Sequence, residues 1–234
     1  MNLKENNFDD FSQFTTPIID EIGDNHIATS LDTPMKKNAF AMTDSEKMAK
    51  IQMHFRQIMD TLGLDLTDDS LSGTPSRVAK MFVTEIFSGL DPKNKPSVAL
   101  FENKYEYNQM LVEKNILVQS TCEHHFLPIY GKAHVAYIPN KKVVGLSKLN
   151  RIVQYYCKRP QVQERLTTQI ANELIDKLDT KDVAVYIDAK HMCVSSRGIK
   201  DISSSTVTSY FSGQFKKEEF KQQFLSSFRT DTDY

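Results

Sequence analysis

Residues 111–144 read LVEKNILVQSTCEHHFLPIYGKAHVAYIPNKKVV, and the spacing of apolar residues in this stretch indicates the class of fold. Apolar residues stand at alternate positions in two runs: Val112, Ile116 and Val118, then Ala133, Val135 and Tyr137. A period of two is typical of strands that bury one face. The stretch therefore predicts two strands, with the polar segment 120–126 at the exit of the first.

Helical periodicity flanks this strand pair on both sides. Apolar residues three or four positions apart predict a helix over about 44–62, which Thr43 and Glu46 begin as a capping box, and a second helix from the cap Thr74 to about Gly89. Two more helices follow the strand pair, one capped by Ser147 and one after Pro160.

Alternating residues at 183–187 and 207–211 then predict two further strands, before a polar C-terminal helix near 216–228. Paired strands with two helices between the pairs are typical of an α+β domain with an antiparallel sheet.

The composition is that of an ordinary globular protein with a sizeable core. Hydrophobic residues make up 40% of the 234 residues and charged residues 25%, and the formal net charge is −1. Without a global basic field, the chain is not expected to bind nucleic acid or an anionic membrane. It has no run of about 18 apolar residues and no recognisable secretory leader, so we expect a cytoplasmic protein.

The chain divides into three predicted parts. Residues 1–42 hold seven acidic and three basic residues without a sustained period, which predicts an acidic, flexible arm. Residues 43–96 are predicted to form a helical part, and residues 97–234 a catalytic domain that contains the sheet. Because the capping box lies after the arm, the first helix is expected to fold without it.

The segment 120–126 reads STCEHHF and carries the densest chemistry. Cys122 and His125 are three residues apart, so one turn of chain lets a sulfur and an imidazole nitrogen reach the same ion. Cys193 follows another predicted strand and offers a second sulfur. Two sulfurs and one nitrogen suit zinc, and three protein ligands leave a fourth position for water, as in catalytic zinc sites. The alternative is that both cysteines are small buried hydrophobes.

Two further histidines and several cations lie near these residues in the sequence. His124 and His191 could pass protons near neutral pH, although hydrogen-bonded core histidines would look the same in sequence. The positive charges are Lys148, Arg151, Lys158, Arg159 and Arg165, with Ser147 at their head, then Arg197 and Lys200. Guanidinium groups bind phosphate oxygens bidentately, but a helical charge run is more often a solvated face. Gln163 and Glu164 could pair with the donor edge of a guanine or lie in solvent.

Five stretches resemble those of the GTP cyclohydrolase I family, in the same order: GTPSRVAKMF, STCEHHFLPIYGKAHVAYIP, VVGLSKLNRIVQYY, KRPQVQERLT and KHMCVSSRGIKD. The resemblance runs from about residue 45 to 220. It implies a zinc enzyme that opens the guanine imidazole ring of GTP with water and releases formate. The product then recloses to 7,8-dihydroneopterin triphosphate, the first step toward folate and other pterins.

The resemblance also implies a role for each matching residue. The zinc ligands would be Cys122, His125 and Cys193. The residues that move protons would be His124 and His191 at the guanine ring and Ser147 at the ribose. The guanine would be bound by Glu164 with Gln163 beside it, and the triphosphate by Lys148, Arg151, Arg197 and Arg77, the last of these reaching from a neighbouring subunit. Cys157 departs from the expected pattern and is interpreted as a core residue.

The fold implied is the tunnelling fold, an antiparallel sheet with helices on one face that extends into rings. Two stacked five-membered rings would give a homodecamer with sites at subunit interfaces. A zinc nucleoside deaminase is a competing interpretation, but its Pro-Cys-x-x-Cys motif is absent. A structural zinc scaffold without activity should lack one of the acid, base or cation positions, and none is missing.

Overall fold

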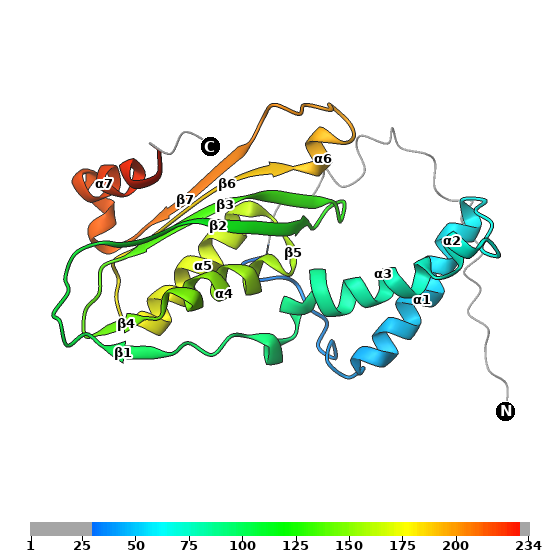
Figure 1. Ribbon diagram of the computed structural model, residues 1–234, viewed down its shortest axis with the longest axis horizontal. Coiled ribbons are helices and arrows are strands. Elements are labelled where there is room, and N and C mark those ends of the chain that lie inside the picture. Colours follow the sequence, from blue (N-terminus) through cyan, green and yellow to red (C-terminus); the bar gives the residue numbers. More distant parts are fainter. Residues whose placement is uncertain (1–29, 230–234) are drawn as a thin grey trace. The chain divides into compact units, whose positions relative to one another are not determined.

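The computed structural model describes residues 30–229, and most of the predicted arm lies outside this range. Its centre is a five-stranded sheet with the order β5-β2-β3-β6-β7 (Figure 1). The strands are β2 (Leu111–Cys122), β3 (Pro128–Tyr137), β5 (Pro160–Gln161), β6 (Val183–His191) and β7 (Thr206–Phe211). All neighbours are antiparallel except the short β5, which runs parallel to β2. The predicted α+β class and antiparallel sheet are confirmed.

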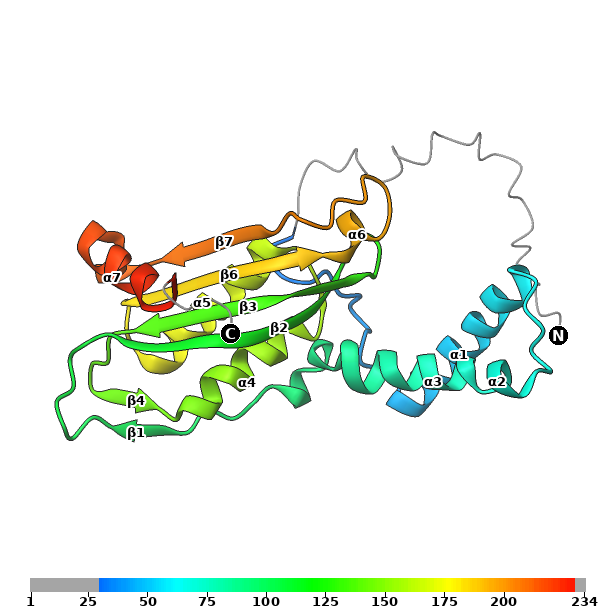
Figure 2. The same cartoon turned by 45° about the horizontal axis from the view of Figure 1, so that its top comes forward.

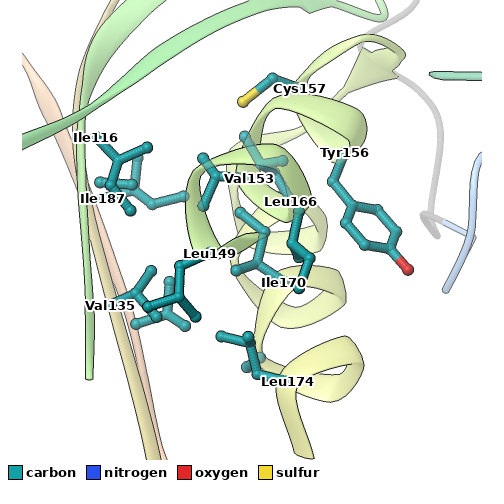
Figure 3. Packing of buried hydrophobic residues seen from close by; sticks show 14 of the residues in the cluster. Ile116, Val135, Leu149, Val153, Tyr156, Cys157, Leu166, Ile170, Leu174 and Ile187 are labelled. Atoms are coloured by element: carbon teal, nitrogen blue, oxygen red, sulfur yellow. The ribbon is translucent and has the colours of Figure 1, made fainter. Parts of the chain in front are cut away.

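Two long helices cover one face of this sheet. These are α4 (Leu146–Cys157) and α5 (Gln163–Leu178), whose apolar stripes pack against inward-facing residues of β2, β3 and β6 (Figure 3). Figure 3 shows Leu149 and Val153 of α4 facing the strands, with Cys157 in the same cluster. Cys157 is fully buried, and burial raises the pKa of its thiol to about 12, as expected for a core residue.

The C-terminal helix packs on the opposite face. A short 3₁₀ turn, η5 (Gly213–Lys216), leads into α7 (Glu218–Arg229), which Figure 2 shows on the side of the sheet away from α4 and α5. Phe224 and Phe228 of α7 are buried in one cluster with Ala136 of β3. The rings of His134 and Phe228 stack with their centroids 3.8 Å apart. Helices therefore contact both faces of the sheet, although the two long ones share one face.

The helical part precedes the sheet. It contains α1 (Asp44–Thr61), α2 (Asp69–Ser72) and α3 (Thr74–Met81). The capping box at the start of α1 is confirmed, because the Thr43 hydroxyl accepts from the Glu46 amide and the Glu46 carboxylate accepts from the Thr43 amide. None of the described helices combines the length and apolarity that a bilayer crossing requires.

Three predicted helix boundaries are wrong. Thr74, the predicted cap of the second helix, is the first residue of α3, and Gly73 is its N-cap. The second helix does not continue as an α-helix to Gly89: α3 ends at Met81 and passes into a π-helical turn, η2 (Phe82–Ile86), and a 3₁₀ turn, η3 (Ser88–Leu90). The residue that caps α4 is Gly145 instead of Ser147, so Ser147 lies inside the first turn.

Two 3-residue strands, β1 (Leu100–Glu102) and β4 (Lys142–Val144), form a separate antiparallel pair. A 3₁₀ turn, η4 (Pro92–Asn94), precedes them.

Candidate functional site

Three chain segments meet at one end of the sheet because of its register. Ile129, near the start of β3, pairs with Ser120 of β2 on one side and with His191 of β6 on the other. The last residue of β2, Cys122, is therefore close to the residues that follow β6. One of these is Cys193, in the four-residue helix α6 (Met192–Ser195).

Residues 123–127 connect β2 to β3 and are called here the site turn. It is closed by two backbone hydrogen bonds, from the Cys122 amide to the Leu127 carbonyl at 2.8 Å and from the Phe126 amide to the Cys122 carbonyl at 2.9 Å. Phe126 has a φ of +54°, and its ring packs on that of Phe87 with the two ring centroids 5.1 Å apart. The turn therefore presents His124 and His125 from an anchored backbone.

The predicted metal ligands come together. The donor atoms of Cys122, His125 and Cys193 all lie within 4.8 Å of one another. Cys122 is buried, Cys193 is half-buried and His125 is exposed, so the group opens to solvent on one side. Two thiols and an imidazole at this separation fit a zinc ion after small side-chain adjustments.

Two neighbours act on the donors of this group, the Cys122 thiol on Cys193 and Arg197 on His125. Burial and the nearby Cys122 thiol raise the pKa of Cys193 to about 11, because a second negative charge would be poorly solvated there. An Nη1 hydrogen of Arg197 lies against Nε2 of His125, with the two nitrogens 2.8 Å apart. Because a guanidinium can only donate hydrogen bonds, Nε2 of His125 is the acceptor in this contact. Arg197, which the resemblance assigns to the triphosphate, thus lies beside the ligand group.

Of the two predicted proton-transfer histidines, one lies directly against the ligands. Nδ1 of His124 is 3.8 Å from the Cys122 sulfur, and Nε2 is 3.9 Å from an oxygen of Glu123.

The other, His191, contacts Gln163, with Nε2 2.8 Å from the amide oxygen. Partial burial lowers the pKa of His191, and the negative charge of Glu164 acts in the opposite direction.

Gln163 differs from its predicted role beside the guanine. Its side chain is buried, and its amide nitrogen donates to the carbonyls of Thr206 at 2.8 Å and Ile187 at 3.2 Å, with the Thr208 hydroxyl at 3.1 Å. Both N–H groups are thereby directed at β6 and β7, and the oxygen is left for His191. The neighbouring Glu164 is exposed and remains accessible to a ligand.

Three predicted site residues lie elsewhere in this chain, on the first half of α4: the proton carrier Ser147 and the phosphate-binding residues Lys148 and Arg151. That part of α4 lies beside Glu113, whose carboxylate accepts from the Asn150 amide at 2.9 Å. Glu113 precedes Cys122 by nine residues on β2, and a strand rises about 3.3 Å per residue. Allowing for the bulge after Glu113, the two places are roughly 25–30 Å apart. One chain does not bring these residues to its own metal ligands.

The remaining cations separate into different environments. Arg77 is exposed on α3, where its guanidinium donates to the Ser70 carbonyl and the Thr74 hydroxyl. Arg159 and Arg165 are buried and paired with Asp32 and Glu123, so they are not part of a solvated face.

Sequence reasoning missed the polar residues beneath the site turn. The Glu123 amide donates to the Gln161 carbonyl at 3.0 Å, and its carboxylate pairs with Arg165. The one available signal was that Glu123 stands directly between the metal ligand Cys122 and His124 in the sequence. Nothing in the local pattern marks Gln161 or Arg165.

Comparisons with known proteins identify the family of the chain. A family model described as GTP cyclohydrolase I matches residues 51–229. A GTP cyclohydrolase 1 from Flavobacterium johnsoniae is 60% identical over 216 residues, covering 92% of this chain and 97% of the relative. Proteins of the same name from Aeromonas salmonicida and Yersinia enterocolitica are 52% and 51% identical, covering 86% and 87% of this chain and 92% of each relative. The chain belongs to the GTP cyclohydrolase I family.

Proposed function

We propose that this protein is a zinc-dependent GTP cyclohydrolase I. It hydrolyses the imidazole ring of GTP, releases formate and forms 7,8-dihydroneopterin triphosphate, in the cytoplasm. The observation that carries the proposal is the convergence of Cys122, His125 and Cys193 in a chain of this family. Bound by these three residues, zinc would supply a Lewis acid that activates water for attack on the guanine ring.

The histidines are proposed to move protons. Both amide hydrogens of Gln163 point at groups on β6 and β7, so its oxygen accepts from Nε2–H of His191. This leaves Nδ1 of His191 as the nitrogen that exchanges a proton with the guanine ring. His124, beside Cys122, is the second proton carrier.

The substrate is proposed to span two chains. Glu164, exposed at the start of α5, binds the guanine edge, and Arg197 binds the triphosphate from the same chain as the metal ligands. The groups on the first half of α4, Ser147, Lys148 and Arg151, reach the site from a neighbouring subunit, because they are too far from the ligands of their own chain. Arg77 is proposed to bind phosphate in the same way, and the assembly to be a homodecamer.

Incubation of the purified protein with GTP tests this function. We expect stoichiometric formate and, after oxidation, a fluorescent pterin. Cys193→Ala should abolish both, whereas Cys157→Ala, a matched substitution in the core, should leave turnover measurable. Formation of ammonia without formate would show a deaminase instead, and zinc binding without turnover would show a structural zinc protein.

A further inference from the structure

Five side chains form a continuous hydrogen-bonded series beneath the site turn, called here the relay. Its members are Asp32, Gln169, Gln161, Arg165 and Glu123. Gln169 donates to the Asp32 carboxylate at 2.5 Å, Gln161 donates to the Gln169 oxygen at 2.8 Å, and Arg165 donates through Nε to the Gln161 oxygen at 3.1 Å. A second nitrogen of Arg165 pairs with Glu123 in the site turn. The relay thus joins residue 32 to residue 123.

The chemistry of the two ends sets the direction of every bond in the relay. Arg165 can only donate, so the Gln161 oxygen must face it and the Gln161 nitrogen must face Gln169. The Gln169 oxygen therefore accepts from Gln161, so the Gln169 nitrogen must face another acceptor, which is the Asp32 carboxylate. One amide cannot turn over without breaking the bonds of its neighbour, so the two amides share a single orientation.

Burial makes this orientation costly to lose. Gln161 is fully buried, and Gln169 and Arg165 are buried among the residues of α4 and α5. Unpaired polar groups in such surroundings are strongly unfavourable. Asp32 itself is largely exposed, but one of its oxygens accepts from both Gln169 and the buried Arg159. A single exposed carboxylate therefore satisfies two buried donors.

The other end of the relay reaches the site turn. Glu123 lies between Cys122 and His124, and besides its pair with Arg165 its amide donates to the Gln161 carbonyl. The bond to Gln161 is made by its main-chain carbonyl, so of these two attachments only the pair with Arg165 depends on side-chain orientation. Any reorientation of the Arg165 side chain therefore changes what holds the Glu123 carboxylate in the segment that carries His124 and His125.

We propose that Asp32 is a positioning residue for the site turn, acting through the relay although it lies in the segment before the first helix. The relay fixes the orientation of the Gln161 and Arg165 side chains, and Arg165 in turn holds the Glu123 carboxylate and with it the site turn that carries the two histidines. The part of the proposal that concerns turnover rests on the proposed function, whereas the part that concerns metal retention does not.

The test uses the full-length, zinc-loaded protein and two measurements. One is the rate at which zinc passes to a chelating chromophore, and the other is kcat and KM for GTP. We expect Asp32→Ala to speed zinc release and lower kcat by about threefold, with KM nearly unchanged, and Asp32→Asn, which keeps an acceptor oxygen, to restore most of the loss. Asp176→Ala, an exposed acid on α5 paired with Lys177, is the matched control and should match the wild type.

A double-mutant cycle separates the relay from general destabilisation. Glu123→Gln should by itself change both measurements by about tenfold, and adding Asp32→Ala should change them little further, because the relay is already disconnected from the turn. Additive effects would overturn the proposal, as would an Asp32→Ala variant that releases zinc at the wild-type rate. If the wild type failed to turn over GTP, the proposed function would fail while the zinc measurements still decided the relay.

Discussion

The variant Gln163→Leu distinguishes a structural role of Gln163 from the role at the substrate that the sequence predicted for it. The residue is 2% exposed, the two hydrogens of its amide nitrogen have three acceptors within reach on β6 and β7, and its oxygen accepts from His191. Each such bond contributes about 0.5–1.5 kcal/mol net, and leucine recovers part of the loss by filling the same volume. We expect the free energy of unfolding to fall by about 2–4 kcal/mol.

The assay compares Gln163→Leu with Glu164→Leu, its exposed neighbour. In a protein of this size, a loss of that magnitude should lower Tm by roughly 5–15 °C at fixed protein concentration. Gln163→Leu should also lower kcat, because His191 loses the partner that orients its ring. Glu164→Leu should leave Tm within a few degrees and raise KM for GTP. A fully stable Gln163→Leu variant with only a raised KM would refute this reasoning and would indicate that Gln163 binds the substrate.

Four other outcomes are expected. Cys193→Ser should lose the zinc that the wild type is expected to hold, roughly one per chain, and should keep its assembly. Iodoacetamide should leave Cys157 unmodified until the protein unfolds, as mass spectrometry would show. Mixing and reassembling inactive Cys193→Ser and Ser147→Ala chains should restore part of the turnover, because each site would draw on two chains; no recovery from verified mixed assemblies would contradict that. Gly89→Ala should destabilise by about 1–3 kcal/mol in thermal melts, because a Cβ there would lie 2.1 Å from the Tyr155 carbonyl, whereas Gly145→Ala meets only ordinary contacts.

The sequence predicted those parts of the fold in which apolar residues recur at a regular local spacing or a cap motif is present. Alternation identified the long strands, and the capping box identified the start of α1. The second helix shows the limit of this method. Val78, Phe82 and Ile86 are four residues apart, a spacing that drifts around an α-helix with 3.6 residues per turn. The chain instead adopts a wider π-helical turn from Phe82, and the Phe82 ring lies 6.5 Å from that of Phe126 in the site turn.

The convergence of Cys122, His125 and Cys193 was predictable because these residues follow the ends of strand patterns. The separation of the other site residues was not. Resemblance to a family assigns Ser147 and Cys122 to one site, but it does not say whether one chain supplies both. The contact between Asn150 and Glu113 places the first half of α4 far along β2 from Cys122. The same residues that indicate the reaction therefore also indicate an assembly, once their distances are known.

Helix α5 explains why the relay could not be read from sequence. Its apolar stripe is visible as a period, and the polar residues between are ordinarily assigned to solvent. Three of them follow one another at intervals of four: Arg165, Gln169 and Glu173. All three are buried, because segments distant in sequence cover them: residue 123 at Arg165, residue 32 at Gln169, and Lys95 with Tyr156 at Glu173. A second buried stripe of polar residues has the same sequence signature as a solvated face, and only the partners that cover it reveal which of the two it is.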